Sequence, residues 1–292
     1  MAESTPSYDF NRLKSYPIKE QAQMIVSALK CMVDHRDSHG GSSFSGLLDI
    51  VPSYESFPHE AKQDVIQVLK EWLAGNEMKQ LEVAVAMCSR TAIPDVKEAL
   101  LSLLKKEAIT NNRWITSDAI KGLGNLQLAD LLPLFREHAS CISTEHDRAY
   151  CGVVAVLAIA KLDLNSALFY LLEALHRDQR SRDTAPNLFR GQSFLCFLMK
   201  GFLEIHGETS VRPIAQAIAQ GDREDITFAL QLLDGAIEED SRILSLQETP
   251  QTRKAPPPSP PPFVVHLSNE LDLLQQVREN LQKLSKSGDT LR

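Results

Sequence analysis

Trp114 and Asp118 have the spacing W-x-x-x-D and are the first candidates for chemistry. In a helix this spacing places the indole ring and the carboxylate one turn apart on the same face. The two side chains could together form a catalytic site. The alternative is that Trp114 is a core or surface anchor and Asp118 a solvated helix residue. The candidate surface also includes Lys121 on the same segment, and Arg148 and Arg190 on later predicted helices.

Histidine and cysteine side chains gather in one short stretch, with HxxC and HxxxxC spacings that offer ligands acceptable to zinc. These residues are His138, Cys141, His146 and Cys151. The stretch has no CxxC pair, and Cys151 lies in an apolar segment, so we interpret the four as buried thiols and surface imidazoles. His59 and Glu60 form one further pair, typical of the first turn of a helix. We predict neither a metal nor a cofactor.

A third motif lies in a proline-rich segment near the C-terminal end. Lys254, Pro257 and Pro260 have the spacing K-x-x-P-x-x-P, which fits the basic-first polyproline ligand of SH3 domains. Any proline-rich spacer produces this spacing by chance, so a plain linker is the alternative interpretation.

Signatures of nucleotide binding and hydrolysis are missing from the sequence. It contains no GxxxxGK[ST], GxGxxG, GxSxG or HExxH motif. The formal net charge is −7, whereas phosphate binding needs a local basic stripe. The nearest candidate stripe, residues 176–183, contains two aspartates and is expected to be a solvated loop between helices. We therefore predict a protein without catalytic activity that binds protein rather than nucleic acid.

Other features favour a cytoplasmic protein without membrane insertion. The first ten residues are polar and acidic, unlike a secretory signal. The longest uncharged apolar run, residues 150–160, is too short to span a bilayer as a helix. Five widely spaced cysteines without a CxxC pair are typical of a reducing compartment.

The elements that would position these residues repeat along the chain. Residues 122–135 are echoed 36 residues later by residues 158–171, and weaker copies begin near Ala84 and Gly201. Each copy has a helix end rich in leucine and small residues, then a tight corner and a new apolar helix. Such a recurrence is typical of α-solenoids. Four leucines are expected to be buried between repeats: Leu123, Leu126, Leu157 and Leu162.

Over residues 58–240 this pattern resembles the HEAT-repeat family. The resemblance implies an all-α, right-handed α-solenoid of helix pairs whose second helices line a concave face. Trp114 and Asp118 also resemble the Trp and catalytic Asp of HEAT-like DNA alkylpurine glycosylases. This resemblance implies that the ring packs against a damaged nucleotide while the carboxylate stabilises a positively charged sugar. The chain departs from that group because no tryptophan follows Trp114, and because it is acidic where the group must hold DNA.

We predict five segments. They are a polar lead (1–16), a HEAT-like α-solenoid (17–240), a proline-rich linker (241–265), an amphipathic helix (266–285) and a disordered tail (286–292). The amphipathic helix carries leucines near heptad spacing: Leu267, Leu271, Leu274, Leu281 and Leu284. A single helix of this length is marginally stable, so the leucines need a cover, in cis on the last repeat or in trans. We expect this helix to bind a partner or to support weak self-association, and to be dispensable for solenoid stability.

The leading functional hypothesis is a non-enzymatic scaffold or adaptor. It would bind a protein partner of unknown identity on the concave face and through the C-terminal helix. One alternative is an immunity or inhibitor protein that neutralises a basic partner by charge complementarity. The second alternative is a HEAT-like DNA alkylpurine glycosylase.

Overall fold

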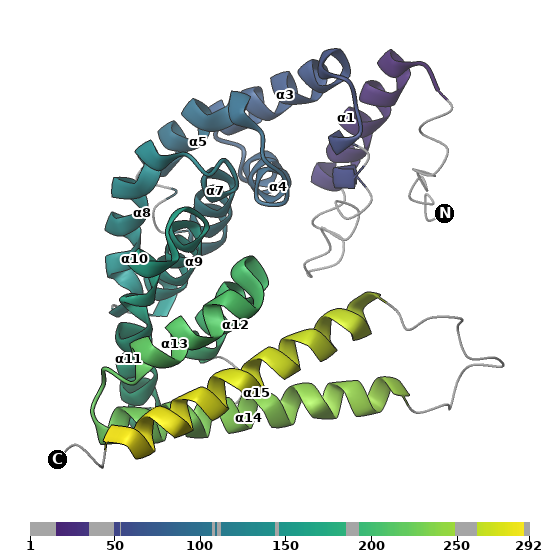
Figure 1. Cartoon of the computed structure of the whole chain (residues 1–292). Coiled ribbons are helices and arrows are strands. Elements are labelled where there is room, and N and C mark those ends of the chain that lie inside the picture. Colours follow the sequence, from purple (N-terminus) through teal and green to yellow (C-terminus); the bar gives the residue numbers. More distant parts are fainter. Residues whose placement is uncertain are drawn as a thin grey trace. The chain divides into compact units, whose positions relative to one another are not determined.

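The computed structural model describes residues 16–34, 50–52, 54–106, 109, 112–143, 146–184, 193–248 and 262–288 (Figure 1). Over these ranges the chain is all-α and contains no strand. It divides into two compact units, Met1–Leu131 and Leu132–Arg292, and each is described by itself.

The first unit consists of helices that pack in pairs. Its longer helices are α1 (Ile18–Asp34), α3 (His59–Ala74), α4 (Met78–Cys88), α5 (Lys97–Leu104) and α7 (Arg113–Asn125). Helix α3 packs on α1, α4 and α5, and α7 packs on α4 and α5. A short 3-10 turn at Pro94–Val96 precedes α5, and a second one at Ala129–Leu131 ends the unit.

Helices α4 and α7 run parallel, because like ends of the two helices meet. At their N-terminal ends, Asn112 Nδ2 lies 3.7 Å from the sulfur of Met78. At their C-terminal ends, Asn125 Nδ2 donates to the carbonyl of Ser89 at 3.0 Å, and Gly122 packs on Cys88 so closely that an added Cβ would lie 3.1 Å from the Cys88 Cβ. The glycine is therefore what allows these helix ends to approach.

The second unit also consists of helices that pack on one another. They are α8 (Leu132–Ala139), α9 (His146–Leu162), α10 (Leu164–Leu168), α11 (Tyr170–Thr184), α12 (Phe194–His206), α13 (Val211–Ile218), α14 (Arg223–Glu248) and α15 (Pro262–Gly288). The 3-10 turns Ser140–Ser143 and Gly207–Ser210 precede α9 and α13. The helix pairs are α3 with α4 and α5 with α7 in the first unit, and α8 with α9, α11 with α12 and α13 with α14 in the second. The second helix of a pair contacts that of the next, as α12 contacts α9 and α14, and the first helices α11 and α13 contact each other.

Helices α9, α12 and α14 also run parallel. The rings of Tyr150 and Phe197 meet near the beginnings of α9 and α12, and His206 Nε2 lies 2.8 Å from the Ala160 carbonyl oxygen near their ends. Between α12 and α14, Cys196 Sγ lies 3.6 Å from the Leu232 carbonyl oxygen, and farther along both helices Lys200 Nζ donates to Asp240 at 2.7 Å. The second unit is thus built from helix pairs whose second helices share one direction.

The two echoed segments adopt similar local structures. Each contains the end of a second helix, a corner and a short helical turn that leads into the next helix. The burial prediction for the four leucines is correct for Leu123, whereas Leu126, Leu157 and Leu162 are only half-buried. Leu126 and Leu162 lie at the ends of α7 and α9, where the corner leaves one side of the side chain open.

Residues 176–183, predicted to be a solvated loop, are instead part of α11. Asp178 is 1% exposed and accepts hydrogen bonds from Ser193 Oγ, Phe194 N and Leu195 N at 2.7, 3.1 and 3.0 Å. It therefore caps α12, although burial outweighs these hydrogen bonds and raises the pKa of its carboxyl group. The prediction of a solvated loop failed because Asp178 interacts with the beginning of α12, farther along the chain. Charge patterns within one segment do not reveal such a contact.

The predicted boundaries of the proline-rich linker and the tail also need correction. Helix α14 continues to Glu248, and α15 begins at Pro262 rather than residue 266 and ends at Gly288. An Arg242–Glu239 ion pair of 2.7 Å connects this extension to the preceding turn of α14. Proline is tolerated at the first position of a helix, where α15 has Pro262. Residues 249–261 lie outside the described part of the chain.

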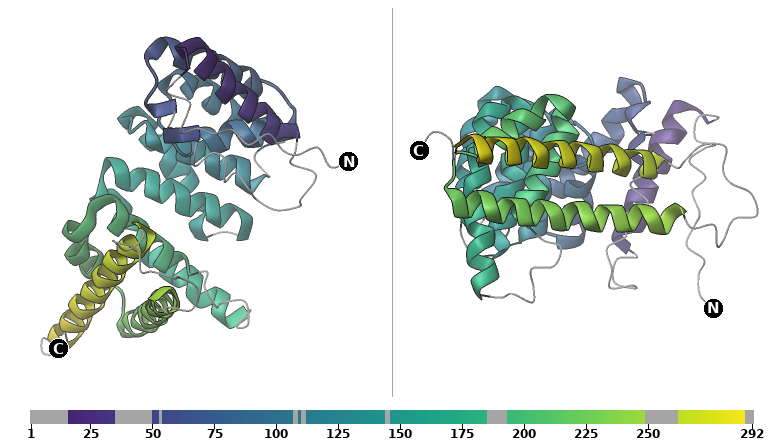
Figure 2. Two further views of the ribbon diagram at one scale, coloured as in Figure 1. Left: turned by 90° about the vertical axis from the view of Figure 1, so that its right-hand side faces the viewer. Right: turned by 60° about the horizontal axis from the view of Figure 1, so that its bottom comes forward.

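The apolar side of helix α15 packs on other helices of the same chain. It runs back along α14, and also packs on α12 and α13 (Figures 1 and 2). Leu274, Val277 and Leu281 are fully buried, Leu267 is nearly so, and Leu271 and Leu284 are half-buried. The leucine stripe is therefore part of the core of the second unit, and the expectation that this helix is dispensable conflicts with its burial.

Ion pairs fix the position of α15 along the unit. Glu270 accepts from Lys200 at 2.9 Å, and Lys200 also pairs with the nearly buried Asp240. Burial opposes the charge of Lys200, but its hydrogen bonds to the two carboxylates prevail and raise its pKa. Arg278 pairs with Asp234 of α14. Removing Lys200 would leave the nearly buried Asp240 and Glu270 without the cation that compensates their charges.

The beginning of α14 should make the stability of the protein sensitive to acid. Asp222 and Asp225 accept from each other's backbone N–H, and Asp225 also lies 3.2 Å from His176 Nε2 and 3.0 Å from Gln179 Nε2. Burial opposes ionisation of Asp225, but these hydrogen bonds, that of His176 foremost, outweigh it and lower the pKa. The stabilisation is therefore present above the ordinary aspartate pKa of 3.8 and is lost as the pH falls below it.

We expect the free energy of unfolding to fall between about pH 5 and about pH 3 by a larger amount in the wild type than in Asp225→Asn. Urea denaturation at each pH measures this difference. Asp272→Asn, at an exposed position on α15, is the control and should keep the wild-type dependence. Parallel curves for wild type and Asp225→Asn would contradict the assignment.

Candidate functional site

An exposed tryptophan stands at the beginning of α7. Trp114 is 57% exposed, whereas the other tryptophan of the chain, Trp72, is 8% exposed. The side chain of Asn112 accepts from the backbone N–H of Trp114 and Ile115, both at 3.2 Å, and so caps the helix at this point. The guanidinium carbon of Arg113 lies 4.6 Å from the centre of the Trp114 ring, within cation–π distance.

Met78 extends this apolar surface. It is 41% exposed at the first position of α4, and the amide of Asn112 connects it to the beginning of α7. Because α4 and α7 are parallel, both helices present a large apolar side chain at the same end of the pair. We call Met78, Arg113, Trp114, Asp118 and Lys121 the Trp114 surface.

Asp118 lies on α7 one turn after Trp114, as the sequence predicts, but it is half-buried. Burial raises the pKa of its carboxyl group, against the opposing influence of Arg90, Lys121 and a hydrogen bond from Ser89. Lys121 is exposed. The groups that surround this carboxylate all belong to the first unit. They are compatible with a structural role for Asp118 as well as with a catalytic one.

The remaining predicted residues of this site do not belong to the first unit. Arg148 is exposed near the beginning of α9, in the second unit. Arg190 lies outside the described residues, as do Lys254, Pro257 and Pro260 of the proline motif. The structure therefore brings together Trp114, Asp118 and Lys121 from the predicted set.

Sequence reasoning did not single out an aromatic pair in the second unit. Phe197 is 44% exposed, and its ring meets that of Tyr150 edge-on, with ring centres 6.2 Å apart. Both residues lie near the beginnings of second helices, as Trp114 does in its own unit. An aromatic residue shortly after the start of a predicted second helix was the signal that could have found them.

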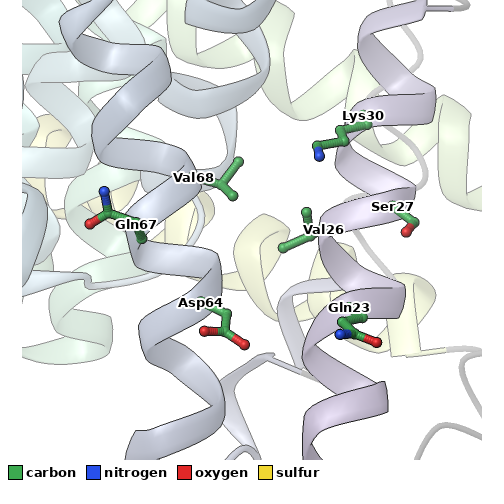
Figure 3. A pocket seen from close by; sticks show the side chains of 7 residues that line it. All are labelled: Gln23, Val26, Ser27, Lys30, Asp64, Gln67 and Val68. Carbon is green, nitrogen blue, oxygen red and sulfur yellow. The ribbon is translucent and has the colours of Figure 1, made fainter.

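A shallow groove of about 460 Å³ lies between α1 and α3 (Figure 3). Val26 and Val68 point toward each other across it, and Lys30 and Asp64 stand on opposite helices above and below them. The remaining lining residues are Gln23, Ser27 and Gln67. One lysine and one aspartate on the rim of a polar groove do not form a recognisable catalytic arrangement.

In the predicted His/Cys stretch, His138 and Cys141 are half-buried, and the side chain of His146 lies outside the described residues. Burial raises the pKa of Cys88 to about 12 and that of Cys196 to about 11, so both are protonated at neutral pH. Cys151 is buried, and burial lowers the pKa of His138. Within the described ranges, no three His, Cys, Asp or Glu residues converge as metal ligands would, and no helix is long and apolar enough to cross a membrane.

Comparisons of the chain with protein families, with curated proteins and with solved structures give no match. The class that the fold itself defines is an all-α protein of packed helix pairs.

Proposed function

We propose that the chain is a non-enzymatic scaffold or adaptor, a short right-handed α-solenoid of HEAT-like helix pairs that binds a protein partner. Two observations support the solenoid. Parallel second helices occur in both units, α4 and α7 in the first and α9, α12 and α14 in the second. Each pair needs its neighbours to bury its apolar side, as in repeat proteins. Five widely spaced cysteines without a CxxC pair support a cytoplasmic location.

The observation that carries the binding function is the exposure of Trp114 beside Met78 and Arg113. Tryptophan, methionine and arginine are enriched at protein interfaces, and tryptophan and arginine dominate binding hot spots. A tryptophan held by a capped helix also loses little conformational freedom when a partner covers it. We therefore assign the partner surface to the N-terminal ends of α4 and α7.

The C-terminal helix has a different role in this proposal. Repeat proteins need a terminal element that covers the last apolar face, and α15 lies on the last helix pair in this way. Partner binding by Leu267, Leu271, Leu274, Leu281 or Leu284 would require α15 to leave its place. We accordingly propose α15 as a cap.

Trp114→Ala should weaken partner binding by about tenfold or more, because it removes the central anchor of the surface. Affinity capture with the full chain identifies the partner, and calorimetry with the purified partner measures the dissociation constant. Phe169→Ala is the matched control, since it removes a 71% exposed aromatic residue from the second unit. Equal affinity of the partner for wild type and Trp114→Ala would contradict this surface.

A DNA glycosylase is the competing candidate, favoured by the Trp114–Asp118 pair with Arg90 and Lys121 beside the carboxylate. The half-buried carboxylate and the net charge of −7 speak against it. We expect no release of alkylated purine from DNA above background, and turnover that disappears in Asp118→Asn would establish the enzyme. An inhibitor of a basic partner, which the acidic chain also suits, would be recognised by capture of a basic protein whose activity it blocks.

A further inference from the structure

We propose that residues 9–12 of this chain dock into the groove between α1 and α3 (Figure 3). One ion pair with each helix and one aromatic contact would hold them there. Residues 1–15 lie outside the described part of the chain. The residues that line the groove are distinct from those of the Trp114 surface, so this binding surface goes beyond the proposed function.

The groove offers one charge of each sign and an apolar floor. Lys30 of α1 and Asp64 of α3 are exposed on opposite sides of it, and Val26 and Val68 between them are half-buried. The other lining side chains are neutral. Within the part of the chain that the structure describes, neither Lys30 nor Asp64 forms a hydrogen bond or an ion pair. Charge complementarity therefore selects an occupant with an acidic, an apolar and a basic group in this order.

The two charges lie at different ends of the groove. Gln23 and Asp64 are at one end, and Lys30 is at the other, beyond the two valines (Figure 3). Because Gln23 precedes Lys30 in α1, the end with Asp64 is nearer to the beginning of that helix. A segment that enters the groove from the beginning of α1 thus meets the negative charge first and the positive charge second.

The sequence just before α1 carries the matching order of side chains. Read backwards from the beginning of α1, it presents Arg12, then Phe10, then Asp9. A segment that turns back along the groove would therefore bring its basic side chain to Asp64 and its acidic side chain to Lys30. The aromatic ring between them would lie over the two valines.

The lengths of the segment and the groove agree. Residues 9 and 12 of an extended segment lie about 10 Å apart, and Gln23 and Lys30 are also separated by about 10 Å along α1. Residues 9–16 can span about 23 Å, which covers the roughly 18 Å from the beginning of α1 to Lys30. Because successive side chains of an extended segment point to opposite sides, residues 9 and 12 would face different helices.

Attachment to the same chain favours this occupant over a second copy. Exposed ion pairs are individually weak, so two of them and one ring would not hold a separate molecule firmly. A segment joined directly to α1 instead has an effective concentration in the millimolar range. A partner segment with the same order of charges could enter the groove only by displacing it.

Carbodiimide coupling of the full chain tests this placement, because the reagent joins a carboxylate to an amine that it touches. Mass spectrometry should find a link between Asp9 and Lys30. The yield should fall about fivefold or more in Asp64→Arg, which repels Arg12, and should recover when Arg12→Glu is added. Lys105→Glu, at an exposed position outside the groove, is the control and should leave the yield unchanged.

A mixture of chains with natural and heavy nitrogen shows whether the link forms within one chain. Links between heavy and natural chains would mean that a second copy fills the groove, and would overturn docking in cis. Absence of the Asp9–Lys30 link, or an equal yield in wild type and Asp64→Arg, would also overturn it. Thermal melting checks that Asp64→Arg is folded. Phe10→Ser leaves the described helices unaltered and should lower the yield as well.

Discussion

A chain truncated after Glu248 should lose the cooperative unfolding of its second unit, because the truncation removes α15 from the core. Leu274, Val277 and Leu281 have no exposed surface, and their removal would uncover the apolar sides of α12, α13 and α14. The truncation also leaves Lys200 and Asp240 without Glu270. We expect the melting temperature of the second unit to fall by more than about 10 °C, measured by circular dichroism.

Point substitutions test the same helix without shortening the chain. Leu274→Ala and Leu281→Ala should each lower the free energy of unfolding by about 2–5 kcal/mol, the usual cost of emptying a fully buried leucine site. Glu279→Ala, at an exposed position on α15, is the control and should change it by less than about 0.5 kcal/mol. If the truncated chain and both leucine variants melted like the wild type, α15 would not belong to the core, and recruitment of a partner by this helix would regain support.

Alanine in place of glycine should have opposite effects at two helical positions of the second unit. An added Cβ at Gly152 in α9 would lie 2.6 Å from the backbone nitrogen of Ile142 and 3.0 Å from its Cα. Backbone cannot rotate away as a side chain does, so α9 and the turn Ser140–Ser143 would have to separate. Gly152→Ala should therefore destabilise the protein by about 1–3 kcal/mol.

Gly235 is the matched control in α14, because a Cβ there would meet nothing within 4 Å. Gly235→Ala should stabilise the protein by about 0.5–1 kcal/mol, since alanine loses less backbone entropy than glycine in a helix. Chemical denaturation of both variants gives the two changes in the free energy of unfolding. Stabilisation by Gly152→Ala would mean that α9 does not approach the preceding turn as closely as the structure has it.

The positions of the helices were largely predictable because helical periodicity is a local property of the chain. The echo between residues 122–135 and 158–171 located two corners, and Asn112 at the beginning of α7 is a residue type that caps helices. The end of α14 was predicted too early because the proline-rich linker was taken to begin at residue 241, although its first proline is Pro250 and nothing breaks the helix before Glu248. Composition was a poorer guide at that point than helix-breaking residues.

Part of the candidate site was also predictable. The W-x-x-x-D spacing placed Trp114 and Asp118 on one face of a helix, and the structure keeps them there. Periodicity could not tell how deeply each side chain would be buried, because that depends on the turn after α4, which places Ser89 and Arg90 beside Asp118. Phe197 and Tyr150 escaped notice for the same reason, since their contact joins two helices.

By itself, the sequence determined an all-α chain of amphipathic helices, because turn and capping residues and the helical period act within a few residues of one another. Only the tertiary structure decided three other features. They are the packing of α15 on α12, α13 and α14, the cap that Asp178 provides for α12, and the exposure of Trp114. Each depends on which helix packs beside which, and the free energy that selects those neighbours comes from burying apolar surface contributed by segments far apart in the chain.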